Sequence, residues 1–194
     1  MGGTKQKMTT MNKESKILSA EGCVSAALVG ADGTVVSFVD SKNTTTYAAA
    51  DVVALAYAGD SAYIPRYIAF IYGPQGSSLD GIDAGRATNW SSVEQACRTN
   101  NLGVSVTPFS YKPSVDASDA GSDDRVYNSN RVTFHGRTQN IAANNCVFKA
   151  CLLGKGYNDS QYCLLALVDL GKNGTYKEKP EDFELAVDWA VTFK

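Results

Sequence analysis

The chain has 194 residues, 44% hydrophobic and 20% charged, which is an ordinary globular composition, long enough for one domain with a sizeable core. Its 18 Lys and Arg against 20 Asp and Glu leave a formal net charge of −2. This near-neutral balance offers no basic field for nucleic acid or for an anionic membrane surface, so neither is expected as a partner.

Residues 1–14 are polar and are predicted to form a flexible N-terminal arm, followed by a single domain over residues 15–194. The start lacks the apolar core of a signal peptide, and no apolar run approaches the roughly 18 residues of a membrane helix. We therefore expect the protein to be made in a reducing cytoplasm, with its five cysteines as thiols. Cys146 and Cys151, five residues apart in a strand-like run, are expected on opposite faces of a sheet.

The first half of the domain mixes strands with short helices. Residues 23–40 resemble a hairpin that turns at Ala31-Asp32-Gly33. Residues 44–60 are Ala-rich and predict a helix. The stretch "YIPRYIAFIYG" is apolar on both faces, which predicts a strand covered on both sides.

A long polar loop over residues 74–90 precedes a short second helix, "SSVEQACRTN", for which Ser92 is the expected cap and Gln95 its capping-box partner. "LGVSVTPFSY" is strand-like, and a second long polar loop runs over residues 111–130. Loops of this length are usually functional or mobile.

From residue 131 onward the pattern is all β. "RVTFHGRT" alternates with Val132 and Phe134 inward, and two apolar strands over residues 145–154 and 161–170 flank a hairpin connection. A meander of this kind predicts sequential strands side by side and antiparallel. The fold class expected is mainly β, an antiparallel β-sandwich with one or two short helices and two long loops.

The strongest strand pattern is the last one, "FELAVDWAVTFK". Its period of two predicts one core face and one face that is wet or at an interface. Its expected neighbour is the strand over residues 161–170. A strand of this length can also complete the sheet of a neighbouring subunit. The predicted core residues are Phe183, Leu185, Val187, Trp189, Val191 and Phe193.

No pattern of catalytic or cofactor-binding residues emerges. His135 is the only histidine, and it shares the polar face of its strand with Arg131, Thr133 and Arg137. No phosphate-binding glycine loop is present. The acidic loops carry Asp80 and Asp83, and then Asp116, Asp119, Asp123 and Asp124, but neither matches the twelve-residue calcium loop. We therefore expect no enzyme, no cofactor and no metal, although spacing alone does not exclude a pair of catalytic carboxylates.

Three pieces, taken together, resemble the small β-sandwich structural subunits of tailed-bacteriophage virions. They are an Ala-rich helix leading into "IPRYIAFIYGPQG", the stretch "NWSSVEQACRTN" leading through a strand and loop into "NRVTFHGRT", and "CLLALVDLGKNGTYKEKPEDFELAVDWAVTF". The resemblance spans about residues 45 to 194. It implies a non-enzymatic virion protein of the tail, collar, neck or fibre attachment, or a head decoration protein, made in the host cytoplasm. It also implies a ring or trimer of identical copies that docks other virion proteins.

The two long loops are the predicted contact regions, since their Gly, Ser and Asp residues cannot fill a core. The candidate interface residues are Pro74, Asp80, Asp83, Trp90, Asp116 and Asp119. Trp90 also supports an alternative, a carbohydrate-binding or adhesin module in which its ring would stack on a sugar.

Overall fold

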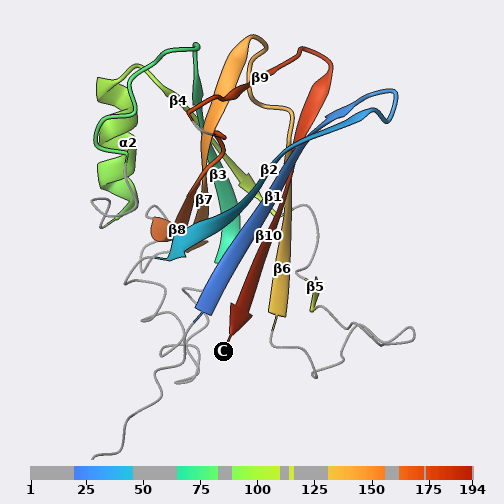
Figure 1. Cartoon of the computed structure of the whole chain (residues 1–194). Helices are drawn as coiled ribbons and strands as arrows, with labels where there is room; N and C mark the ends of the chain where they lie inside the picture. Colours follow the sequence, from blue (N-terminus) through green and yellow to red (C-terminus); the bar gives the residue numbers. More distant parts are fainter. Residues whose placement is uncertain are drawn as a thin grey trace, which may run out of the picture.

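The computed structural model describes residues 20–45, 65–82, 89–109, 114–115, 131–155, 162–172 and 174–193. Within these ranges the fold is mainly β, with two antiparallel sheets, one a half-barrel, and one short helix (Figure 1). The elements are β1 (Ala20–Gly30), β2 (Val35–Thr45), β3 (Pro65–Gly73), α2 (Trp90–Thr99), β4 (Gly103–Pro108), β5 (Ser114–Val115), β6 (Arg131–Thr138), β7 (Asn145–Lys155), β8 (Tyr162–Asp169), β9 (Lys177–Lys179) and β10 (Phe183–Phe193).

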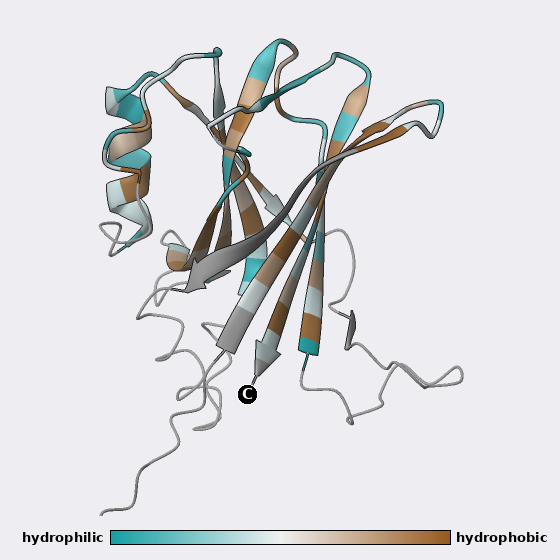
Figure 2. Ribbon diagram, viewed as in Figure 1, coloured by the Kyte–Doolittle hydropathy of each residue, from teal (hydrophilic) through white to brown (hydrophobic). Residues whose placement is uncertain are grey.

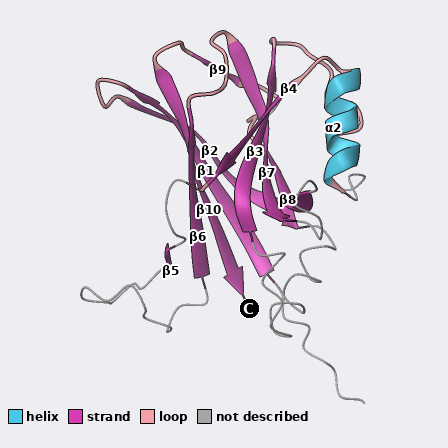
Figure 3. Cartoon of the chain, turned by 180° about the vertical axis from the view of Figure 1, so that it is seen from behind, coloured by secondary structure: helices cyan, strands magenta, loops and turns pink. Residues whose placement is uncertain are grey.

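The strands follow one path, β4-β3-β7-β8-β2-β1-β10-β6-β5, with β9 added beside β7. β2 is the joint between the two halves of this path. It pairs with β1 from Val35 to Asn43 but with β8 only through Thr44 and Thr45. The β1-β10-β6 half and the β4-β3-β7-β8 half therefore form two layers with a core between them (Figures 1 and 3).

The predicted β1–β2 hairpin is present and longer than its sequence pattern indicated. Gly33 takes a φ of +83°, which favours glycine, and the Asp32 carboxylate accepts hydrogen bonds from the Thr34 backbone N–H (2.9 Å) and the Thr34 hydroxyl (2.8 Å). The first two residues of the predicted helix 44–60 belong to β2, and residues 46–60 lie outside the described ranges.

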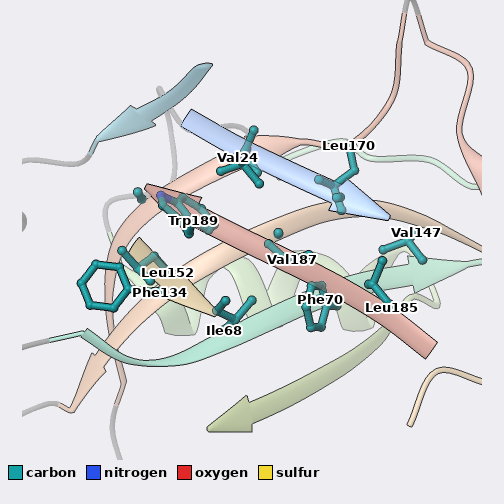
Figure 4. Close-up of a cluster of buried hydrophobic side chains, with 14 of the residues drawn as sticks. Val24, Ile68, Phe70, Phe134, Val147, Leu152, Leu170, Leu185, Val187 and Trp189 are labelled. Carbon is teal, nitrogen blue, oxygen red and sulfur yellow. The ribbon is translucent and has the colours of Figure 1, made fainter. Parts of the chain in front are cut away.

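The first core lies between the two layers. It draws side chains from β1, β3, β6, β7, β8 and β10, which appear as brown bands along the strands in Figure 2 and as sticks in Figure 4. Leu185, Val187 and Trp189 are buried, as predicted for the last strand. Phe183 and Val191 are partly buried against this core, and the side chain of Phe193 lies outside the described residues.

The neighbours predicted for β10 were wrong. It pairs over its full length with β1, from Ala20 opposite Phe193 to Gly30 opposite Phe183, and its other edge pairs with β6. β8 lies between β7 and β2 instead. The alternating pattern specifies which face is buried, but it says nothing about which strand lies alongside. With both edges of β10 used within its own chain, it does not complete the sheet of another subunit.

A second core fills the space between α2 and the outer face of the β3-β7-β8 layer. Trp90, Val93 and Cys97 lie one helical turn or two apart and are all buried. They pack with Ala69 and Ile71 of β3, whereas Ile68 and Phe70 face the first core. The prediction that this strand is covered on both sides is confirmed.

The helix begins earlier than its sequence pattern indicated. Asn89, rather than Ser92, is the N-cap, and its carboxamide oxygen accepts a hydrogen bond from the Ser92 backbone N–H (2.9 Å). Trp90 is therefore the first helical residue rather than part of the polar loop. The helix gains one more buried side chain on the face that meets the sheet.

β7 carries an irregularity that corrects the expected placement of two cysteines. The pairing with β3 shifts between Ile71, opposite Lys149, and Tyr72, opposite Val147. The extra residue on β7 reverses the alternation, so Cys146 and Cys151 both lie in the second core rather than on opposite faces. All five cysteines of the chain lie in the described ranges, and none is joined to another by a disulfide.

Candidate functional site

The outer face of the β1-β10-β6 layer carries a row of polar side chains, and in the described part of the chain no helix covers it. Ser25 lies opposite Asp188, and Asp188 lies opposite His135. The Asp188 carboxylate and the His135 Nδ1 atom are 2.7 Å apart, with side chains 61% and 19% exposed. Their residue types invite comparison with a Ser-His-Asp hydrolase.

The order of these residues excludes that chemistry. A catalytic triad needs the histidine between the serine and the carboxylate. Here Asp188 occupies the middle strand, which leaves Ser25 and His135 two strands apart, at roughly 10 Å for strands about 4.8 Å from each other. His135 cannot accept a proton from Ser25 across that distance. The row belongs to a surface rather than to a nucleophilic site.

Two residues after His135 on β6, the same sheet face bears an ion pair with β10. The Arg137 guanidinium lies 3.6 Å from the Glu184 carboxylate, with side chains 50% and 25% exposed. Exposed pairs of this kind contribute about 0 to 1 kcal/mol to stability. Between this ion pair and the His135–Asp188 contact, Ala27 and Ala186 are neighbours in the sheet. The face therefore combines small side chains with charges that are already partnered.

A cluster of polar groups near the end of β8 is also structural in character. The Asp169 carboxylate accepts hydrogen bonds from the Lys149 ammonium (2.9 Å), the Tyr176 hydroxyl (3.2 Å) and the Gly171 backbone N–H (2.7 Å). Burial and the neighbouring Asp169 carboxylate raise the pKa of Tyr176 to about 12. A phenol with this pKa stays protonated at neutral pH, so the cluster links Gly171 and Tyr176, which follow β8, to Lys149 of β7 without offering a base.

The buried cysteines do not provide a nucleophile either. Burial, and to a lesser degree the Glu94 carboxylate, raise the pKa of Cys97 to about 11. Burial also raises the pKa of Cys146 and of Cys151. Reactive cysteines have lowered pKa values, so these thiols act as small apolar side chains of the second core.

The six predicted interface residues differ in exposure, and three of them lie outside the described residues. Pro74 and Asp80 are exposed, while Asp83, Asp116 and Asp119 lie outside the described residues. Asp80 borders a shallow hollow that continues along α2 through Gln95 to Asn100. No group of three or more metal-binding side chains occurs within the described ranges.

Trp90 is buried, contrary to the expectation that it lies in an exposed contact loop. Its side chain is only 2% exposed and packs edge-to-face against Tyr162, with ring centroids 6.4 Å apart. It offers no ring face to a sugar. Its spacing of three from Val93 and seven from Cys97 was the sequence signal that could have placed it on the buried face of the helix.

Among the described residues, the large hydrophobic side chains that are exposed lie where the sequence pattern did not indicate them. Val35 and Val36, at the start of β2, are 60% and 40% exposed. From Val35 to Asn43, one edge of β2 pairs with β1 and the other edge has no strand partner among the described residues. We call this outer side, residues 35–43, the open β2 edge. The run "TVVSFV" has no polar residue at alternate positions, so its pattern did not separate a buried from an exposed face.

Comparison of the chain with known protein families, with curated proteins and with solved structures finds no match. Within the described ranges, the helix that is present is too short and too polar to span a membrane. The case for a function therefore rests on the surfaces described above.

Proposed function

We propose that the protein is a non-enzymatic structural subunit of a bacteriophage virion. In this proposal it belongs to the tail, neck or fibre attachment, associates with copies of itself and docks other virion proteins. Its short sequence resemblances to such subunits motivate the virion setting. The mainly β fold is compatible with it.

The open β2 edge is the observation that carries the proposal. An unpaired strand edge presents a row of backbone N–H and C=O groups that can pair with another chain, and proteins usually cover or blunt such edges. Here the edge begins at Val35 and Val36, the two large hydrophobic side chains that are exposed in the described part of the chain. Adding a strand is a common mode of protein recognition.

The alternatives receive less support from the described residues. An adhesin module is less supported because Trp90, the residue expected to stack on a sugar, is buried. A hydrolase based on Ser25, Asp188 and His135 has the wrong order across the sheet. A head decoration protein differs from a tail or neck subunit in its partners, so only the partner proteins separate these two.

The test is the solution mass of the purified protein, measured by light scattering over a wide range of concentration. It is repeated with the proteins encoded beside it in the genome. We expect a mass that rises to a defined multiple of 20.7 kDa, or a stable complex with one of those proteins. A monomer at every concentration that binds none of them would overturn the proposal. So would turnover of a polysaccharide by the purified chain.

A further inference from the structure

The open β2 edge has the length and shape to accept one extended segment. Its nine residues span roughly 30 Å at about 3.3 Å each. The pairing of β2 with β1 shifts at Phe38, because Ala26 lies opposite Val39 and Ala27 opposite Ser37. Such a bulge bends the strand. A segment with a free end follows a bent edge more easily than the edge of a second folded sheet does.

The distribution of charge along the chain indicates which segment could pair with the open β2 edge. Residues 1–19, which lie outside the described ranges, contain four Lys and one Glu, for a net charge of +3. Because the whole chain carries −2, residues 20–194 carry −5. Because Phe183 lies opposite Gly30, the exposed Glu181 and Asp182 lie at the same end of the sheet as the hairpin turn that holds Asp32, with β1 between them and β2. A basic segment is therefore attracted to this end of the sheet.

We propose that residues 1–19 of a second copy of the chain add to the open β2 edge as an extra antiparallel strand. This deepens the proposed function, on which it rests, by naming the contact between copies. Nineteen extended residues reach roughly 60 Å, and nine of them suffice to cover the edge, so about ten remain to span from one copy to the next. Thr9 and Thr10 are of a type enriched in strands, and Met8 and Met11 add apolar side chains that suit a contact with Val35 and Val36.

The direction of the chain favours a second copy over the same copy. β1 starts where β2 ends, since Gly22 lies opposite Asn43. Residues 1–19 lead directly into Ala20, at the β1 end that lies beside the end of β2. If they lay on the open β2 edge of their own chain, they would run parallel to β2 and then pass over its end to reach β1. Every strand pair in the described sheets is antiparallel, and parallel pairing is slightly less stable. A segment from another copy can approach in the antiparallel direction.

The first experiment uses a chain that begins at Ser15 and a labelled synthetic peptide of residues 1–19. We expect the peptide to bind the shortened chain, more weakly as salt is added. We expect Val35→Lys to weaken binding at least about tenfold, because it places a charge against the basic peptide. Thr99→Lys adds the same charge at an exposed position on α2 and should leave the affinity unchanged. Equal binding of a scrambled peptide of the same composition, or of the Val35→Lys chain, would overturn the proposal.

The second experiment compares hydrogen exchange at residues 35–43 in the full and the shortened chains. We expect slow exchange in the full chain, fast exchange in the shortened chain and renewed protection when the peptide is added. Equal protection in both chains would show that another part of the chain covers the edge, and protection in a monomeric full chain would show that its own segment does. Either result would overturn this inference. If the shortened chain still assembles to the same mass, the inference falls while the proposed function stands.

Discussion

Trp189 provides the sharpest test of the first core, because two substitutions there should differ strongly in their effect on the free energy of unfolding. Its side chain is 0% exposed and packs between the two layers. A buried aromatic side chain removes about 150–250 Å² from water, and about 25 cal/mol per Å² gives roughly 4–6 kcal/mol. Alanine retains a small part of this burial, so Trp189→Ala should lower the free energy of unfolding by about 3–5 kcal/mol.

Trp189→Phe should cost far less, because the indole nitrogen has no hydrogen-bond partner among the described residues. An unpaired buried donor costs about 1–3 kcal/mol. Phenylalanine loses about 1 kcal/mol of burial but removes that donor. We therefore expect a change within about 1 kcal/mol of the parent protein, in either direction.

Urea unfolding followed by far-UV circular dichroism measures both variants. Trp90 remains in each of them as a fluorescence probe of the second core. The reasoning would be refuted if Trp189→Ala cost less than about 1 kcal/mol, since the residue would then not fill a packed core. It would also be refuted if Trp189→Phe cost as much as Trp189→Ala, since the unpaired nitrogen would then carry no penalty.

Three further predictions concern the sheet and the thiols. Asp188→Ala should change the free energy of unfolding of the isolated subunit by at most about 0.5 kcal/mol, because the Asp188 side chain that contacts His135 is exposed; a loss above about 2 kcal/mol in urea unfolding would contradict this. Deletion of residues 183–193 should yield insoluble or self-associating protein, because it exposes the edges of both β1 and β6; a soluble, folded product in circular dichroism would show the strand to be dispensable. Alkylation without reductant should label all five cysteines after denaturation, while Cys97, with its pKa of about 11, should react slowly in the folded protein at pH about 8; mass spectrometry that finds fewer than five labels would reveal a bridge.

Local sequence patterns predicted well which face of a strand is buried, but they predicted poorly which strand pairs with it. The alternation in residues 183–193 correctly assigned Leu185 and Trp189 to the core. It could not show that β1, more than 150 residues earlier, lies alongside, because the burial period is the same whichever strand is adjacent. The β1–β2 hairpin could be predicted from the sequence, because the residues that form its turn, including Gly33 at positive φ, are adjacent in the chain.

Irregular features limited the prediction of the site. A single extra residue in β7 reversed the alternation and moved Cys146 to the face of Cys151. Because the residues around Trp90 are polar, the sequence predicted it in a loop, whereas it is the first residue of α2, after the N-cap Asn89. The open β2 edge follows from the limited contact between β2 and β8, which is a property of strand order rather than of any local run of residues.

The central position of β10 also has a consequence for how the protein folds. β1 is among the first described elements to leave the ribosome, but its partner β10 follows about 150 to 170 residues later. Until then β1 can pair only with β2, and β6 lacks the strand that joins it to the layer. Pairings between such distant segments make folding slow and leave strand edges exposed to aggregation in the meantime. The yield of soluble protein should therefore depend on chaperones that shield the edge of β1 until β10 has emerged.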